Sequence, residues 1–301
     1  WDKVLMHIPW FQPAEKINKR YSIECLQQRK WDIVHPTFFD PYFLSYIGKK
    51  PYVVTVHDMI SELYPNMEEQ SQHKKKIIQN AAGIISVSEN TKRDLCEMLN
   101  VPEEKVTVIY HGGPSIEVIK SKPIVREKYF LYIGNRDKYK AFDVFLAGYS
   151  SFIQSHSDVK LVCTGKPFTF SERSLLHKLG VMDSVVYFHP SDEELHNLYA
   201  YALAFVYPSE YEGFGMPILE AYAYGCPVLL NKKSCFPEIA TNAAIYFDTD
   251  NKKSIIDSLV SIYNCSQQER EDLINRGYCR LSTFSWKNSA KQLAKVYQSI
   301  V

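Results

Sequence analysis

The stretch Tyr207-Pro-Ser-Glu-Tyr-Glu-Gly-Phe-Gly-Met-Pro-Ile-Leu-Glu220 combines features of a strand, a loop and a helix start. The apolar run at 202–207 predicts a buried strand. Two glycines then allow a tight turn that exposes backbone N–H groups, and Pro217 has the fixed φ preferred in the first turn of a helix. We therefore predict a strand, a ligand-binding loop and a helix that begins near Met216.

This predicted helix start has the geometry that proteins use to hold phosphate, because its N–H groups and the positive end of its dipole face the loop. We assign Gly213, Phe214 and Gly215 to the bound nucleotide at this point. Glu212 and Glu220 bracket the loop, and since an acid repels phosphate, we assign them to hydroxyl groups. A sugar joined to a ribose through a diphosphate satisfies this pattern. The alternative is a helix with an acidic first turn, which is common because Glu complements the dipole.

The two acids stand in a context that resembles a known family. Seven residues separate Glu212 from Glu220, Gly-Phe-Gly and Pro lie between them, and Ala-Tyr-Ala-Tyr-Gly-Cys-Pro-Val-Leu follows. This pattern, from Phe205 to Glu238, resembles that of the retaining glycosyltransferases of family 4. These are group 1 glycosyltransferases with the GT-B fold, and the chain looks most like the mannosyltransferases among them. The resemblance implies an α/β chain of two doubly wound, Rossmann-like domains facing each other across a cleft.

Composition and charge limit the classes of function. The 301 residues, 46% of them hydrophobic, suffice for two domains of ordinary size. A net charge of +1 argues against a nucleic-acid binder that depends on phosphate neutralisation. Seven scattered cysteines without a Cys-x-x-Cys pair favour a reducing, cytoplasmic setting over a disulfide framework or a zinc site. No apolar run reaches the roughly 20 residues that span a bilayer.

Short apolar runs alternate with helical spacing along the chain, which is typical of parallel sheets covered by helices. We predict an acceptor-side domain at 1–120, a nucleotide-sugar-binding domain at 121–285, and a last helix at 286–301 that packs on the first domain, as the resemblance implies. The linker is placed at 115–128, which is charged and aperiodic. The predicted strands are 32–35, 51–56, 83–87, 106–110, 129–133, 159–163, 185–188, 202–207, 227–230 and 244–247.

The beginning of the chain departs from the family pattern. Relatives usually open with a strand and a Gly-rich loop, and residues 1–35 contain neither. We therefore expect that the natural beginning or an early segment is missing. Acceptor binding is consequently the property that this sequence predicts least.

Two polar stretches of the first domain have alternative interpretations. His57 follows a predicted strand and is either a structural residue or, as the resemblance implies, a contact of the donor sugar. Ser88 is predicted to cap a helix. Lys74-Lys75-Lys76 is either a solvated helix face or a contact with an anionic membrane surface, so the predicted location is the cytoplasm or the cytoplasmic face of the inner membrane.

Cations follow the first strand of the second domain in Gly134-Asn-Arg136-Asp-Lys138-Tyr-Lys140. Arg forms two-pronged bonds to phosphate, and Lys supplies a movable point charge. The resemblance implies an Arg and a later Lys on the diphosphate, which we assign to Arg136 and Lys140, with Lys138 as the substitute; a plain surface-charge interpretation stays open. Gly165 follows the next strand and either lines the nucleotide site or forms a simple turn.

Taken together, the sequence predicts a metal-independent retaining glycosyltransferase without a resident cofactor. It would move a hexose, with GDP-mannose the favoured donor, to a saccharide or lipid-linked acceptor in bacterial cell-surface polysaccharide synthesis. The predicted catalytic residues are His57, Arg136, Lys140 and Glu212, with Glu220 on the ribose and no side-chain nucleophile. The alternatives are a non-catalytic GT-B-like binding subunit and, more weakly, a dinucleotide oxidoreductase, although no Gly-x-Gly-x-x-Gly follows an early strand.

Overall fold

The computed structural model describes residues 14–64 and 67–301, so the expectation for the opening 13 residues lies outside it. The chain divides into two compact units. Of the described residues, unit 1 comprises those up to 86, 92–109 and 291–301, and unit 2 comprises 87–91 and 110–290. This division differs from the predicted boundary at 120 because the segment after 109 bonds to unit 2: the N–H groups of Gly113 and Glu117 donate to the carbonyls of Phe284 (3.3 Å) and Ala223 (3.0 Å).

Unit 1 contains a parallel sheet in the order β1-β2-β3, formed by Val53–Val56, Gly83–Ser86 and Val106–Val108. The predicted strand at 32–35 is wrong, because only Val34 forms a β-bridge, to Tyr52. Pro36 and Pro51 flank this bridge and have no N–H to donate, so the ladder cannot extend. The helices are α2 (Ala14–Gln28), α3 (Ile60–Leu63), α4 (Glu68–Gln79), α5 (Glu89–Leu99) and the short 3₁₀ turns η1 (Pro41–Ser45) and η2 (Glu103–Lys105).

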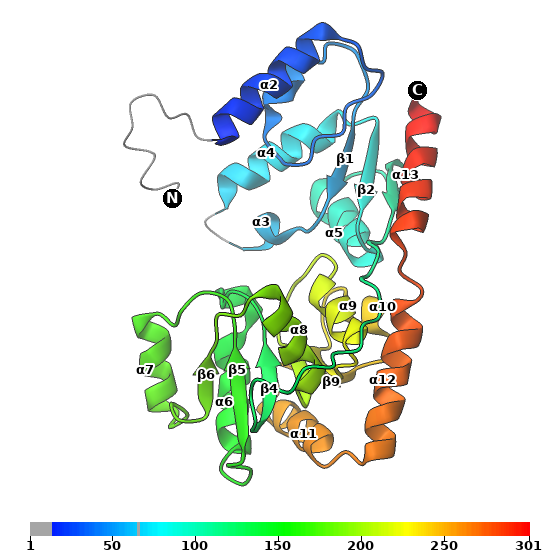
Figure 1. Cartoon of the computed structure of the whole chain (residues 1–301). Coiled ribbons are helices and arrows are strands. Elements are labelled where there is room, and N and C mark those ends of the chain that lie inside the picture. Colours follow the sequence, from blue (N-terminus) through cyan, green and yellow to red (C-terminus); the bar gives the residue numbers. More distant parts are fainter. Residues whose placement is uncertain (1–13, 65–66) are drawn as a thin grey trace. The chain divides into compact units, whose positions relative to one another are not determined.

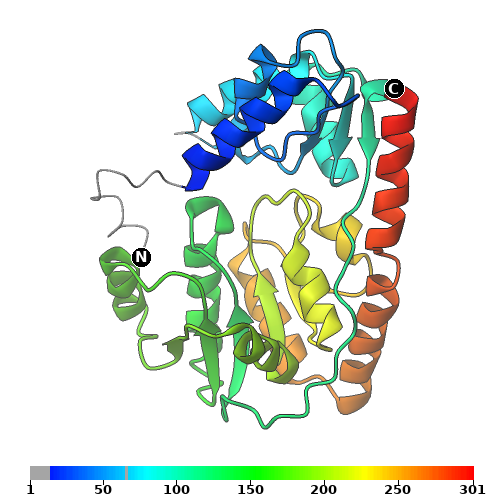
Figure 2. The ribbon, with the colours of Figure 1, turned by 45° about the horizontal axis from the view of Figure 1, so that its top comes forward.

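The second half of α13 (Trp286–Ile300) belongs to unit 1 and covers one face of its sheet (Figure 2). Val296 and Ile300 pack against Val53 and Ile85 there. A polar contact fixes the same helix, since Tyr297 Oη lies 2.6 Å from Nδ1 of His35, whose Nε2 lies 2.9 Å from Thr55 Oγ1 on β1.

Unit 2 contains six parallel strands in the order β6-β5-β4-β7-β8-β9 (Figure 1). The chain starts in the middle at β4, moves outward through β5 and β6, and then returns to β7 on the other side of β4. The sheet therefore has its topological switch point between β4 and β7. The strands are β4 Lys128–Tyr132, β5 Val159–Cys163, β6 Val185–Tyr187, β7 Ala204–Tyr207, β8 Val228–Asn231 and β9 Ile245–Phe247.

Helices cover both faces of this sheet, as the strand pattern predicts for a doubly wound unit. Tyr129 and Leu131 of β4 point into one core with α8 and α9, and Phe130 and Tyr132 point into the other with α6 and α11. None of the described helices is both long and apolar enough to cross a bilayer. The helices of unit 2 are α6 Phe142–Phe152, α7 Phe170–Lys178, α8 Asp192–Tyr201, α9 Met216–Ala223, α10 Phe236–Ala240, α11 Lys252–Tyr263 and α12 Gln267–Leu281, with the 3₁₀ turn η3 Lys138–Lys140.

The prediction of a solvated face at 74–76 holds for Lys75 and Lys76 but is wrong for Lys74. The Lys74 side chain is 3% exposed, and its Nζ lies 2.7 Å from Oε2 of the equally buried Glu62. The ammonium also donates to the carbonyl of Asp58 (3.0 Å). Lys74 lies on the buried face of α4 together with Ile78, four positions on, so helical spacing rather than charge decides its burial.

We expect Lys74→Met to destabilise unit 1 by about 3–5 kcal/mol, because Glu62 would remain buried without its cation. Lys75→Met should cost little, because Lys75 is exposed on the same helix. Melting curves of the two variants beside the wild type test this expectation. Equal melting temperatures for both variants would contradict a stabilising role of the buried pair.

Candidate functional site

The loops that follow β4 and β7 meet at the switch point of unit 2. Lys140, from η3, places its Nζ 2.5 Å from Oε1 of Glu212. The N–H of Glu210 donates to the carbonyl of Tyr139 (2.7 Å), which joins the two loops directly. The side chains of Lys140 and Glu212 are only 18% and 11% exposed, so their ion pair is partly shielded from water. The structure thus brings two of the predicted catalytic residues into contact.

The surroundings of Glu212 hold this pair in place. The N–H of Glu212 donates to Ser234 Oγ (3.1 Å), and Ser234 Oγ donates back to the carbonyl of Glu212 (2.7 Å). Lys140 Nζ lies 4.9 Å and 5.6 Å from the ring centres of Tyr139 and Tyr207. Burial, and then the neighbouring Glu212 carboxylate, raise the pKa of Tyr207 well above its ordinary value. The Tyr207 phenol therefore stays neutral beside the acid.

Residues 87–91, which belong to unit 2, anchor the glycine loop through Gly213. Ser88 Oγ and Thr91 Oγ1 lie 2.7 Å and 3.2 Å from the Gly213 carbonyl and donate to it. Ser88 Oγ also accepts from the N–H of Thr91 (3.0 Å), so the predicted helix cap is confirmed. Because a trans peptide directs its C=O and N–H to opposite sides, the N–H of Phe214 points away from Ser88.

The helix α9 begins at Met216, as predicted, with Gly215 as its N-cap at φ +88°. Glycine adopts this left-handed conformation with little strain, whereas residues with a side chain do not. Glu220 lies one turn into the helix, and its Oε2 accepts a hydrogen bond from Tyr199 Oη (3.0 Å). Burial, and then the Glu220 carboxylate, raise the pKa of Tyr199, so the phenol keeps its proton and fixes one oxygen of Glu220.

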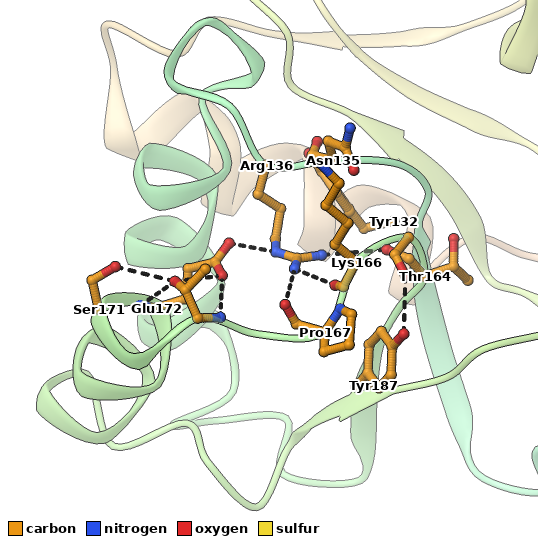
Figure 3. Close-up of polar contacts among 11 residues, drawn as sticks. Tyr132, Asn135, Arg136, Thr164, Lys166, Pro167, Ser171, Glu172 and Tyr187 are labelled. Atoms are coloured by element: carbon orange, nitrogen blue, oxygen red, sulfur yellow. Dashed lines mark hydrogen bonds and ion pairs between the residues drawn. The ribbon is translucent and has the colours of Figure 1, made fainter. Parts of the chain in front are cut away.

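Arg136 bonds to Glu172 and to the turn after β5 (Figure 3), whereas Lys140 bonds to Glu212. Its Nε lies 2.6 Å from Oε1 of Glu172, and its side chain is 3% exposed. Its terminal nitrogens donate to the carbonyls of Thr164 (3.3 Å), Lys166 (2.5 Å) and Pro167 (3.3 Å). A two-pronged bond from Arg136 to a diphosphate would require at least one of these bonds to break, because only one of the five N–H donors remains. The substitute cation Lys138 is exposed on η3.

Gly165 has a steric role beyond that of a simple turn. It adopts φ +97°, and a Cβ placed on it would lie 2.4 Å from the carbonyl oxygen of Gly134. Tyr187 Oη donates to the Gly165 carbonyl (3.0 Å). The loops after β4 and β5 therefore pack backbone against backbone beside the switch point.

His57 belongs to unit 1, directly after β1. His57 is exposed, yet desolvation by the surrounding protein lowers the pKa of its imidazole. The Asp58 charge acts to raise this pKa, and the Lys74 charge acts to lower it further. The imidazole is therefore mainly neutral near pH 7. Its contact with the donor sugar stays a prediction.

Sequence reasoning missed three supporting residues: Tyr199, Glu172 and Ser234. Glu172 had a local signal, because Thr169-Phe-Ser-Glu172 matches a capping box, which the structure contains. Tyr199 and Ser234 are recognised only through contacts made 21 and 22 positions away along the chain. Among residues 14–64 and 67–301, no group of His, Cys, Asp and Glu side chains could hold a metal ion.

Comparisons with known proteins give a consistent assignment. Residues 116–280 match the family described as Glycosyl transferases group 1, and residues 3–112 match Glycosyltransferase Family 4. The O-antigen chain mannosyltransferase RfbU of Salmonella typhimurium is 32% identical over 67% of this chain and 58% of its own length. The O-antigen chain mannosyltransferase B of Escherichia coli is 26% identical over 94% of this chain and 78% of its own length.

Solved structures share the fold at low identity. The Anabaena protein HepE, in complex with UDP-glucose, superposes with a TM-score of 0.77 at 16% identity and covers 96% of this chain and 84% of its own. The sucrose-phosphate synthase of Thermosynechococcus elongatus gives a TM-score of 0.74 at 18% identity, over 96% of this chain and 80% of its own. The predicted GT-B fold of two Rossmann-like domains is confirmed.

We expect Gly165→Ala to destabilise unit 2 more than Gly180→Ala. Both positions have positive φ, which costs alanine about 1–2 kcal/mol, but a Cβ at Gly180 meets nothing within 4 Å. At Gly165 the contact with the Gly134 carbonyl should add about 1–3 kcal/mol. Melting curves of the two variants measure the difference. Equal losses would show that the close approach of the two loops is not rigid.

Proposed function

This chain belongs to the group 1 glycosyltransferases, and on that premise we propose that it is a retaining mannosyltransferase of cell-surface polysaccharide synthesis. The donor is a nucleotide diphosphate sugar, with GDP-mannose favoured, and the acceptor is a saccharide or a lipid-linked saccharide. The two O-antigen mannosyltransferases among its relatives support the sugar and the setting. The observation that carries the proposal is the ion pair of Lys140 and Glu212 at the switch point, beside the start of α9.

The pair suits a donor that carries both a diphosphate and sugar hydroxyls. When the donor binds, Lys140 exchanges Glu212 for the diphosphate, and Glu212 accepts hydrogen bonds from the sugar. The N–H groups at the start of α9 add partial positive charge beside the leaving group. Each charged group therefore gains a new hydrogen-bonding partner as it loses the old one.

Retention requires the diphosphate to leave and the acceptor oxygen to arrive on the same face of the sugar. The enzyme then contributes mainly charge stabilisation and positioning. Lys140 stabilises the negative charge that develops on the leaving diphosphate, and no side-chain nucleophile is assigned. A neutral His57 is proposed to donate a hydrogen bond to a sugar hydroxyl, a role that fits the lowered pKa of its imidazole.

The proposal is tested by calorimetric titration with GDP, UDP, dTDP and ADP, followed by mass spectrometry of products. The product assay combines each matching nucleotide sugar with a cell-envelope glycan extract. We expect binding of one nucleotide and a mass increase of one hexose on an extract component. Failure of all four nucleotides to bind would refute the glycosyltransferase proposal and favour a non-catalytic binding subunit.

We expect Glu220→Gln to weaken nucleotide binding about tenfold or more without lowering the melting temperature. The amide keeps the shape and one acceptor oxygen but loses the charge, and a charge-assisted hydrogen bond to the ribose is worth roughly 1.5–3 kcal/mol. The variant needs one melting curve and one titration with the nucleotide that the wild type prefers.

Glu193→Gln, at an exposed position in the first turn of α8, serves as the control. It should leave nucleotide affinity unchanged. If Glu220 only complements the helix dipole, Glu220→Gln should cost about 0.3–1 kcal/mol of stability and leave affinity alone. That result would remove the ribose assignment.

A further inference from the structure

The guanidinium of Arg136 uses most of its N–H donors in hydrogen bonds within the protein (Figure 3). Four of its hydrogen bonds are formed, one to Glu172 and three to the carbonyls of residues 164, 166 and 167. A guanidinium has five N–H donors, so little capacity remains for a further ligand. Its face lies 4.6 Å from the ring centre of Phe168 and 5.8 Å from that of Phe142.

The contacts of Arg136 place it on the sheet face that α6 covers. Tyr132, at the end of β4, lies on the sheet face that α6 covers, and its ring centre is 4.8 Å from that of Phe142. Arg136 packs beside the same Phe142 ring, and its guanidinium thus lies on the face of α6 and α7. Lys140, four residues on, instead reaches Glu212 in the loop after β7.

The partner Glu172 is itself held in position. Its Oε2 accepts from the N–H of Thr169 (2.6 Å) and from Thr169 Oγ1 (2.8 Å), while Oε1 binds Arg136. The N–H of Glu172 donates to Thr169 Oγ1 (3.2 Å), which completes the capping box of α7. Burial acts to raise the pKa of Glu172, but the bonds from the N–H of Thr169, from Arg136 and from the Thr169 hydroxyl together lower this pKa. Glu172 is therefore a charged, fixed anchor.

Arg136 thus joins a fixed helix start to the turn 164–167, which is the turn that packs on the loop after β4. Gly165 in this turn approaches the Gly134 carbonyl too closely for any Cβ. The N–H of Thr164 also donates to the carbonyl of Tyr132 (2.9 Å), at the carboxyl end of β4. Ligands of open α/β sheets bind outside these carboxyl ends, next to the switch point.

We propose that Arg136 is a positioning residue that acts with Glu172: it fixes the turn 164–167 as a wall of the nucleotide subsite and does not contact the diphosphate. The inference rests on the proposed function for the identity of the ligand. Lys140 is then the cation for the diphosphate, and Arg136 acts on nucleotide binding only through the turn.

The experiment compares Arg136→Met, Glu172→Gln, the double variant and Arg173→Met. Arg173 is exposed on α7 next to Glu172 and serves as the matched control. Two quantities are measured for each full-length variant: the hydrogen-exchange protection of residues 164–169, and the dissociation constant of whichever of GDP, UDP, dTDP and ADP the wild type binds most tightly.

We expect Arg136→Met and Glu172→Gln to lose hydrogen-exchange protection in this turn to a similar extent. Both should weaken nucleotide binding by similar factors of about threefold or more. The double variant should show no further loss, since the two residues act as one unit. Arg173→Met should match the wild type. A direct contact with the diphosphate predicts a different result: Arg136→Met would weaken binding about tenfold or more, while Glu172→Gln, which releases the guanidinium, would leave it unchanged or strengthen it.

That divergence between the two single variants would overturn the proposal. So would unchanged protection of the turn in both variants, or lost protection without any effect on nucleotide affinity. If the wild type binds none of the four nucleotides, the proposed function fails, while hydrogen exchange still decides whether Arg136 and Glu172 hold the turn.

Discussion

The reversal of strand order between β4 and β7 is the constraint on which the site of unit 2 depends. Because the chain leaves β4 toward β5 and later returns to β7 on the opposite side, the loops after β4 and β7 turn in different directions from neighbouring strand ends. Lys140 and Glu212 come from these two loops and meet there. Residues 72 positions apart thus form one ion pair as a consequence of topology.

The parts of the fold that sequence predicts well are those with local causes. The strand at Val159–Cys163 has the predicted bounds, because a run of apolar residues between turn residues has few alternatives. The start of α9 at Met216 follows from Gly215 and Pro217, which impose their backbone conformations wherever they occur. The resemblance in the stretch 205–238 predicts the family, and the match of residues 116–280 to the group 1 glycosyltransferases confirms it.

The parts that sequence does not predict depend on distant partners. The resemblance implies that Arg136 contacts the diphosphate, which stays a prediction, but no local pattern indicates its bond to Glu172, 36 positions on. Lys74 has two lysines after it and the composition of a solvated face, yet Glu62 and the apolar spacing of α4 bury it. The expected strand at 32–35 has enough β-branched residues, but prolines on either side of its single bridge remove the donors of a ladder.

The partners of the charged side chains also suggest how the site could distinguish a nucleotide sugar from a nucleotide alone. Glu172 is paired with Arg136, and Glu220 is held by the uncharged phenol of Tyr199, so neither acid competes with Glu212 for Lys140. A diphosphate that draws Lys140 away would leave Glu212, which is only 11% exposed, beside a second negative charge. Since an unpaired, partly buried carboxylate is costly, the exchange is more favourable when the ligand also offers hydroxyl groups to Glu212. Under the proposed function, the sugar therefore adds to the affinity that the nucleoside diphosphate has by itself, and a nucleotide sugar should bind more tightly than its nucleotide alone.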